Sequence, residues 1–184
     1  MNLITNYLRK QAAQQFIDRI DAGTDVYYVF VGKPEPFASD SAPPQPNQTV
    51  QEVVIDAYAD MIVGKRVTSG DVKLMVPRYD WVSNTVYDVY THTDADLYAK
   101  QFYVVVNEGI NHAVFKCIGN NNGNPSTIPP DVYATSPQDR VYETADGYQW
   151  KFLYNIPDST FRKFATSKFI PVTPNANVTA NSVS

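Results

Sequence analysis

The residues that could carry chemistry are few, and none of them forms a known catalytic or metal-binding motif. The 184-residue chain has two histidines and one cysteine. His112 lies five residues before Cys117, and in a strand this odd offset places the two side chains on opposite faces, which is a poor arrangement for a shared metal. His92 is followed by Asp94 and Asp96, which could hold a cation through oxygen ligands, but we favour a polar loop. We therefore predict no catalytic residue, no metal site and no cofactor.

Arg78 and Asp80 are the second candidate pair. If a strand continues past Pro77, their side chains share one face. An arginine beside a carboxylate is conceivable in catalysis, but we favour a structural pair that locks the end of a strand. An enzyme would instead need a pocket in which carboxylates such as Asp80, Glu108 and Asp146 converge.

Aromatic residues occupy every second position after the turn dipeptide Asp146-Gly147: Tyr148, Trp150, Phe152 and Tyr154. In a strand the four rings point to one side, as the core of a two-layer β structure requires. A sugar-stacking platform and a protein interface are the alternatives. A carbohydrate- or receptor-binding module would need Trp81 or Trp150 exposed in a groove.

The first helix and strand follow from the apolar spacing. Residues 1–24 carry an apolar stripe at three- and four-residue spacing, which predicts a helix that Gly23 ends. Asp25–Gly32 then predicts a strand that is apolar on both faces, and we expect it in the middle of a sheet or between layers. Lys33–Asn47 is a proline-rich loop, either a surface connection or an arm that lies on a neighbour. Its prolines are Pro34, Pro36, Pro43, Pro44 and Pro46.

A second helix is predicted near 49–62, begun by a capping box of Thr49 and Glu52. Glu52, Asp56 and Asp60 follow one another at four-residue spacing, so they form an acidic line that we expect to be either solvated or an interface. Asp60 lies at the unfavourable end of the helix dipole, and we predict that it meets a cation, with Lys65 or Arg66 as the candidates.

The rest of the chain has the pattern of β structure with long loops. We expect a hairpin with a five-residue loop at 107–111 and a loop over 119–130. Asp158 or Ser159 is expected to cap one or two helical turns that reach Ala165. The predicted strands are Val72–Val76, Val86–Thr91, Phe102–Val106, His112–Ile118, Tyr148–Tyr154 and Phe169–Val172.

Composition limits the classes of function. Thirteen Tyr and thirteen Pro favour strands joined by stiff loops, and 43% hydrophobic with 18% charged residues is typical of a folded domain. A net charge of −4 argues against nucleic acid as a partner. The lone cysteine fits a reducing compartment, and the apolar runs are too short to span a membrane, so we expect a soluble chain made in the cytoplasm.

The predicted fold class is mainly β (α+β): a layered antiparallel β-sandwich with an N-terminal helix, a second helix near 49–62 and long Pro/Asn/Gly-rich loops. The predicted domains are a helix at 1–24, a β-rich domain at 25–172 and a linker-like tail at 173–184. Two subdomains split near 80–100 are an alternative within the β-rich part. The tail has no hydrophobic anchor, so we expect the natural chain to continue past Ser184.

Four segments in order resemble the baseplate wedge subunits of T-even-type contractile-tailed bacteriophages. They are Val29–Phe37, which contains Gly32, Pro34, Pro36 and Phe37; the loop Ala42–Pro46, which leads into a helix near Met61 and the basic pair Lys65-Arg66; Pro77–Trp81; and Asp146–Pro157. The match also includes a hairpin that ends at Phe115–Ile118 and covers roughly residues 25 to 172.

The resemblance implies a mainly β structural protein, a late product of infection that is assembled into the virion in the host cytoplasm. It implies a homodimer within each wedge that binds other wedge subunits around the tail tube, and it implies no catalytic residues, membrane, nucleic acid or small-molecule substrate. We expect an apolar interface above ~2,000 Å² in total. The alternative function is a carbohydrate- or host-receptor-binding module of a phage tail.

Overall fold

The computed structural model describes residues 6–32, 35–43, 45, 50–131 and 141–172. The chain divides into two compact units, Met1–Lys73 and Leu74–Ser184. The strands of both units pair in antiparallel sheets, with few helices, so the predicted mainly β class is confirmed. The predicted division into 1–24, 25–172 and 173–184 stays a prediction.

The first unit begins with helix α1, Asn6–Asp21. The helix ends as predicted at Gly23, where the N–H groups of Gly23 and Thr24 donate to the carbonyl oxygens of Ile20 and Arg19. Ile20 is buried, in agreement with the predicted apolar stripe.

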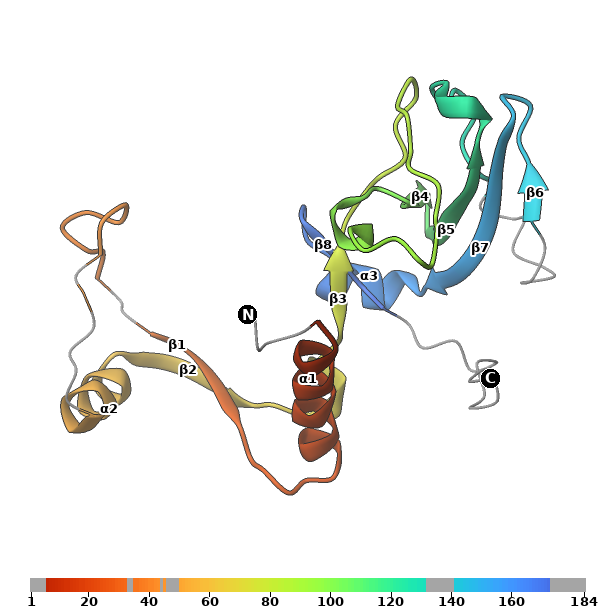
Figure 1. The fold of residues 1–184 in the computed structure, drawn as a ribbon. Helices are drawn as coiled ribbons and strands as arrows, with labels where there is room; N and C mark the ends of the chain where they lie inside the picture. The colour runs from red at the N-terminus through yellow and green to blue at the C-terminus, as the bar shows by residue number, and fades with distance from the viewer. Residues whose placement is uncertain (1–5, 33–34, 44, 46–49, 132–140, 173–184) are drawn as a thin grey trace. The chain divides into compact units, whose positions relative to one another are not determined.

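Strand β1, Tyr28–Gly32, pairs only with β2, Met61–Arg66, among the described residues. The two form an antiparallel ribbon (Figure 1). Its register shifts between Val31 and Gly32. The prediction that this strand lies in the middle of a sheet or between layers is wrong. Its apolar residues are exposed, because no other described strand or helix of this unit covers them.

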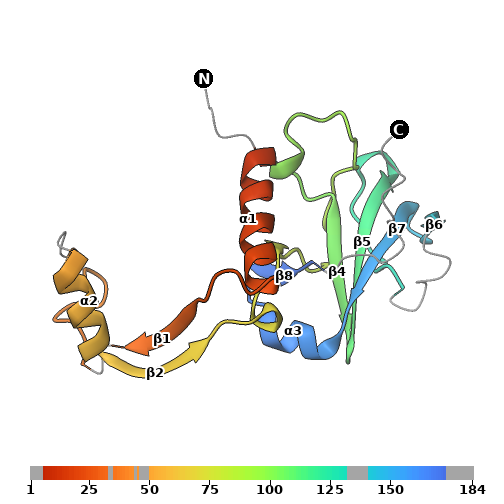
Figure 2. The same cartoon turned by 90° about the horizontal axis from the view of Figure 1, so that it is seen from below.

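Helix α2, Val50–Ala59, leads directly into β2 at one end of the ribbon (Figures 1 and 2). The helix ends three residues before the predicted 62, since Met61 already pairs with Gly32. The predicted capping residue Thr49 lies outside the described residues. After β2, the short helix η1, Ser69–Asp71, is held by Asp71, whose carboxylate accepts from Thr68 and pairs with Lys65 at 2.6 Å.

The second unit is built on a four-stranded antiparallel sheet in the order β4-β5-β7-β6. One cluster of buried residues includes Phe115, Cys117 and Trp150, and a second includes Val114 and Ile156. Because neighbours in β5 belong to different clusters, the two cores lie on opposite faces of the sheet. The strands are β4 Tyr103–Glu108, β5 Asn111–Asn120, β6 Val141–Glu143 and β7 Tyr148–Ile156.

The predicted hairpin is present, but its strands are longer than expected. Glu108 pairs with Asn111, so the loop contains two residues instead of five. The predicted strand Val86–Thr91 is wrong, because this segment forms no strand and its N–H groups bond singly to other loops and strands. Of the predicted strand Val72–Val76, only Met75 and Val76 are regular, and the strand continues through Pro77, which was predicted to stop it. This strand is β3, Met75–Pro77, and it pairs with β8, Phe169–Pro171.

Three short helices lie between the strands of the second unit. Helix η2 is Leu97–Ala99 and helix η3 is Asn121–Gly123, where the predicted loop begins. Helix α3, Asp158–Phe164, follows β7 as predicted, but Pro157 takes the capping position and makes no side-chain bond. Asp158 is the first helical residue, so its carboxylate is available to His112 and Arg162.

The aromatic ladder is divided between the two faces of the sheet. Tyr148, Trp150 and Phe152 belong to the first core cluster, while Tyr154 packs against the second. The pairing of β5 with β7 shifts by one residue between Phe152 and Tyr154. An extra residue in a strand reverses the alternation beyond it, so the prediction that all four rings share one side is wrong for Tyr154.

Candidate functional site

Arg78 and Asp80 form the predicted pair at the end of β3. Two parallel bonds join them, from Nε to Oδ2 at 2.8 Å and from Nη2 to Oδ1 at 3.0 Å. Arg78 also donates to the carbonyl oxygen of Thr166, and Asn107 donates to Asp80. The guanidinium lies 5.3 Å from the ring centre of Phe161. These bonds connect the end of β3 to Thr166 and to strand β4, as a structural lock requires.

Asp146 organises the turn before β7. Its Oδ2 accepts from the hydroxyl of Ser126 and from the N–H groups of Thr127 and Ile128, while Oδ1 accepts from Thr144 and from the N–H of Tyr148. Burial alone would raise the pKa of Asp146, but the hydrogen bond from Thr144 and those from the backbone outweigh it and bring the pKa to about 2. The adjacent Gly147 has φ +80°, which a side chain would strain.

The aromatic ladder serves as core. Trp150 and Tyr148 are fully buried and stacked on each other, and Tyr87 meets both rings edge-on. Trp81 is half-buried against this cluster, and its Nε1 donates to Ser126 at 3.1 Å. Since Trp150 is enclosed and the indole N–H of Trp81 is occupied, the geometry does not favour the carbohydrate-binding alternative.

The carboxylates that an enzyme would need do not share donors. Asp80 is bound by Arg78 and Asn107, whereas Asp146 is bound within its own turn, and Glu108 is exposed in the hairpin. Among the described residues, no three His, Cys, Asp or Glu side chains gather in a way that could hold a metal ion. In the same part of the chain, no helix is long and apolar enough to cross a bilayer.

His112 and Cys117 lie on opposite faces of β5, as predicted. Cys117 is in the first core cluster, and burial raises its pKa to about 12. His112 stacks on Phe161 at 3.8 Å on the other side, between Asn107 at 2.8 Å and Asp158 at 3.3 Å. The spacing of residues in the sequence could not predict the contacts of His112, because they join three separate elements, β4, β5 and α3.

The feature that sequence analysis missed is a surface. Strands β1 and β2 together with helix α2, which we call the apolar arm, expose large apolar side chains along their whole length. Tyr58 is 72% exposed and Tyr28 is 69% exposed. The exposed members are Tyr28, Val29, Phe30, Val31, Val53, Val54, Ile55, Tyr58, Met61, Ile62 and Val63. The available signal in the sequence was the run of apolar residues in β1, which does not alternate with polar ones. Such a run indicates that both faces are buried, but it does not indicate which part of the protein or which partner buries them.

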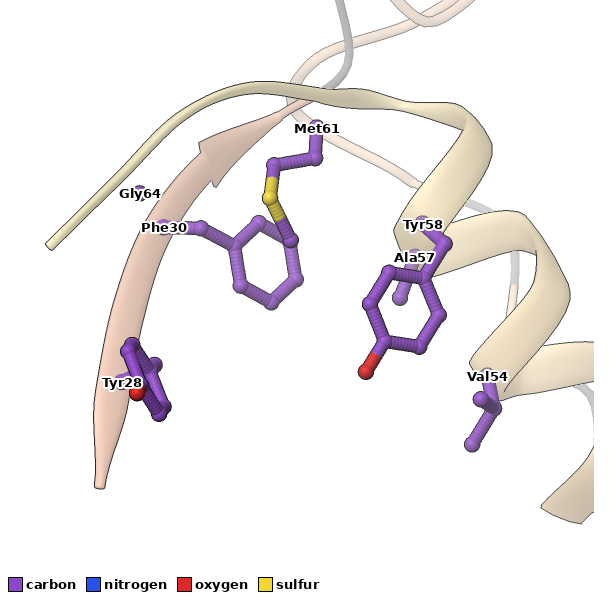
Figure 3. Close-up of a pocket in the computed structure, with 7 residues that line it drawn as sticks. All are labelled: Tyr28, Phe30, Val54, Ala57, Tyr58, Met61 and Gly64. Atoms are coloured by element: carbon purple, nitrogen blue, oxygen red, sulfur yellow. The ribbon is translucent and has the colours of Figure 1, made fainter. Parts of the chain in front are cut away.

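One face of the apolar arm is hollowed into a groove of about 480 Å³ between the ribbon and α2. We call this side the groove face. Figure 3 shows the side chains of Phe30, Met61 and Tyr58 pointing toward the same open space. No charged residue lines the groove in the described part of the chain. Its lining is Tyr28, Phe30, Val54, Ala57, Tyr58, Met61 and Gly64.

The opposite side of the ribbon, which we call the back face, is also apolar. Val31 pairs directly with Val63, and Val29 pairs with Lys65. Residues that pair directly share a face, and neighbours along a strand point to opposite faces. Val29, Val31 and Val63 therefore point away from the groove, so the ribbon is apolar on both sides.

The predicted interface residues lie on or next to this arm. Glu52 and Asp56 are in α2, but their side chains are outside the described set. Asp60 is exposed between α2 and β2. The prediction that Asp60 meets Lys65 or Arg66 is wrong for the described chain, because Lys65 pairs with Asp71 and Asp60 has no ion pair there. The reason is that α2 ends at Ala59 and β2 begins at Met61. Lys65 and Arg66 therefore lie at the far end of the strand from Asp60.

The proline motif is only partly described. Gly32 closes β1, and a Cβ there would lie 2.9 Å from the carbonyl oxygen of Asp60, which explains the absence of a side chain at this position. Phe37 donates its N–H to Asp40 at 3.1 Å. Pro36 and Pro43 are exposed in the same loop. Pro34 and Pro44 lie outside the described residues.

The chain has one distant relative to report among known proteins. No family model matches the chain. The chain is 24% identical, over an alignment of 201 positions, to the baseplate wedge protein gp8 of Enterobacteria phage T4. The alignment includes 92% of this chain, and the chain spans 60% of the length of that relative.

Proposed function

We propose that the chain is a structural subunit of the baseplate wedge of a contractile phage tail. It acts by protein–protein contacts around the tail tube, as a homodimer that also binds other wedge subunits. It is a late protein that enters the virion during assembly in the host cytoplasm, and it performs no catalysis. Its partners do not include nucleic acid, membrane or a small-molecule substrate.

The observation that carries this proposal is the apolar arm. A two-stranded ribbon is marginally stable by itself in water, and a ten-residue helix is shorter than isolated helices need to be. Exposed contiguous apolar surface of this extent is typical of protein interfaces and rare on free monomers. A subunit whose working state is an assembly would have this surface covered.

The distant likeness to a baseplate wedge protein supplies the kind of assembly. The second unit is compatible with a structural role. The carboxylates of Asp80 and Asp146 bind groups within the unit, and the aromatic ladder packs in its hydrophobic cores. Side chains that are already bonded within the unit are expected to position it rather than to react, as a structural subunit requires.

The test is the composition of tails from the phage that encodes this chain. We expect mass spectrometry of purified, contracted and extended tails to detect the chain in a fixed ratio to the other baseplate proteins. We also expect a phage that lacks the gene to produce tube and sheath proteins without complete baseplates. Finding complete baseplates without this chain would refute the proposed function.

A further inference from the structure

His112 is a buried titratable side chain that the proposed function does not use. It lies near the start of β5 and is only 5% exposed. In register, β4 places Asn107 opposite it and β7 places the uncharged Ile156 opposite it. Its ring stacks on Phe161 of α3, with 3.8 Å between the ring centres and 10° between the planes. The side chain therefore joins the sheet to α3 within the second unit.

Both ring nitrogens of His112 face oxygen atoms. Nδ1 lies 2.8 Å from Oδ1 of Asn107, and Nε2 lies 3.3 Å from Oδ1 of Asp158. The orientation of the Asn107 amide is fixed, because its Nδ2 donates to Oδ1 of Asp80 at 2.7 Å and leaves its oxygen toward the ring. A neutral imidazole has one N–H and can satisfy only one of the two oxygens, whereas an imidazolium donates to both.

The groups that α3 brings to the ring also favour the doubly protonated form. The hydrogen bond from His112 is the largest cause that holds the pKa of Asp158 below its ordinary 3.8, and the hydrogen bond from Arg162 comes next. Asp158 is therefore a carboxylate wherever the imidazole titrates. The face of an aromatic ring attracts a cation, so the stacked Phe161 suits an imidazolium.

Two other cations lie near this group, and each is paired with a carboxylate. Arg78 lies 5.3 Å from the centre of the Phe161 ring and bonds to Asp80. Arg162 bonds to Oδ2 of Asp158 at 2.8 Å, so this carboxylate offers one oxygen to Arg162 and the other to the imidazole. These pairs reduce the repulsion that a charged imidazole would meet from the two guanidinium groups.

We propose that His112 is a proton-dependent clamp between α3 and the sheet. With two protons on its ring, it donates to Asn107 of β4 and to Asp158 of α3, and the two bonds together hold α3 in place. When the ring loses one proton, one of its nitrogens and the oxygen that faces it both carry lone pairs, and the clamp opens on that side. The stabilisation is therefore present on the acid side and is lost as the pH rises through about 5 to 8, the range in which histidine changes its charge.

The first test observes the protons on the ring. The full chain is labelled with ¹⁵N-histidine, and His92→Gln removes the signals of the other histidine, which is exposed. We expect the ring ¹⁵N shifts of His112 to show two N–H groups at about pH 5.5 and one above about pH 8. A ring that carries a single N–H throughout this range would overturn the clamp.

The second test measures how firmly α3 is held. The N–H groups of Phe161 and Ala165 donate to the carbonyl oxygens of Pro157 and Phe161. Protection factors from hydrogen exchange correct for the intrinsic effect of pH on exchange. We expect those of the two amides to fall at least ~5-fold between about pH 5.5 and about pH 8. Unchanged protection would overturn the proposal even if the ring titrates.

Three variants separate the clamp from other effects of pH. His112→Gln cannot titrate, so the fall in protection is expected to be absent. Asp158→Asn can turn its amide N–H toward a neutral ring, so its fall is expected to be smaller than that of the wild type, and it serves as the test if His112→Gln does not fold. Arg162→Gln removes the other partner of Asp158 and is expected to keep the fall.

A fall like that of the wild type in His112→Gln or Asp158→Asn, or its loss in Arg162→Gln, would assign the pH dependence to another group and overturn the clamp. Because all of these measurements use the isolated full chain, their outcome is independent of the proposed function.

Discussion

At the scale of single residues, Asp146 is the position in the second unit where a carboxylate is most clearly required. Its two carboxylate oxygens accept five hydrogen bonds that join the loop at 126–128 to the start of β7. An amide at this position keeps the size but offers N–H₂ where an acceptor is needed. We expect Asp146→Asn to lower the free energy of unfolding by roughly 1–3 kcal/mol in urea titrations. Glu108→Gln, an exposed change in the same unit, is the control and is expected to stay within about 0.5 kcal/mol.

Asp146 also makes stability depend on pH. Its pKa is about 2 in the folded chain and 3.8 for an ordinary aspartate. Because the folded pKa is the lower one, the stabilisation is fully present above about pH 4 and is lost as the pH falls toward 2. We expect the difference in urea midpoint between the wild type and Asp146→Asn to shrink over this range. A difference that stays constant from about pH 5 to about pH 2 would show that ionisation of Asp146 contributes nothing.

Substitutions of Arg78 test whether its pair with Asp80 stabilises the end of β3. Both Arg78→Ala and Arg78→Lys are expected to lower the free energy of unfolding by about 1 kcal/mol, because a lysine keeps the charge but cannot make the two parallel bonds to Asp80. Arg162→Lys is the matched control, since its pair with Asp158 lies on an exposed helix turn. Thermal unfolding followed by circular dichroism measures all three. Full rescue by lysine would mean that charge alone holds the strand end.

At the scale of elements, the ribbon depends on the close approach of β1 to the end of α2. A Cβ on Gly32 would lie 2.9 Å from the backbone oxygen of Asp60, whereas a Cβ on Gly64 would meet Met61 at an ordinary 3.5 Å. We expect Gly32→Ala to destabilise the ribbon by roughly 1–3 kcal/mol and Gly64→Ala to leave its pairing intact. Hydrogen–deuterium exchange of the β1 and β2 amides is the measurement. Equal exchange in the two variants would contradict the described junction.

Local sequence patterns predicted correctly those elements whose conformation depends on residues close together in the chain. The stop at Gly23, the hairpin of β4 and β5, the turn at Asp146-Gly147 and the core ladder from Tyr148 all follow from short-range chemistry. Tyr154 was placed on the wrong face because a bulge depends on the partner strand, which spacing within β7 does not encode. The second helix was predicted too long because Met61 fits a helical stripe as well as a strand.

At the scale of the whole molecule, the apolar arm sets the limit of what one sequence can predict. Tyr28–Val31 was predicted to be buried, and the described chain leaves it exposed. The predicted burial and the observed exposure agree if another polypeptide covers these residues. A sequence shows which surface is apolar, but it does not show which chain packs against that surface. The resemblance carried by the ordered motifs, and not the spacing of any side chains, indicated the kind of assembly.

The most direct test is a density map of the intact tail at a resolution that shows side chains. We expect the chain to lie in the baseplate with Tyr28, Phe30 and Tyr58 covered by protein, and with Asp80 and Asp146 in their internal hydrogen bonds. A map in which the baseplate is complete while the apolar arm faces solvent, or in which this chain is absent, would contradict a structural role that depends on the arm.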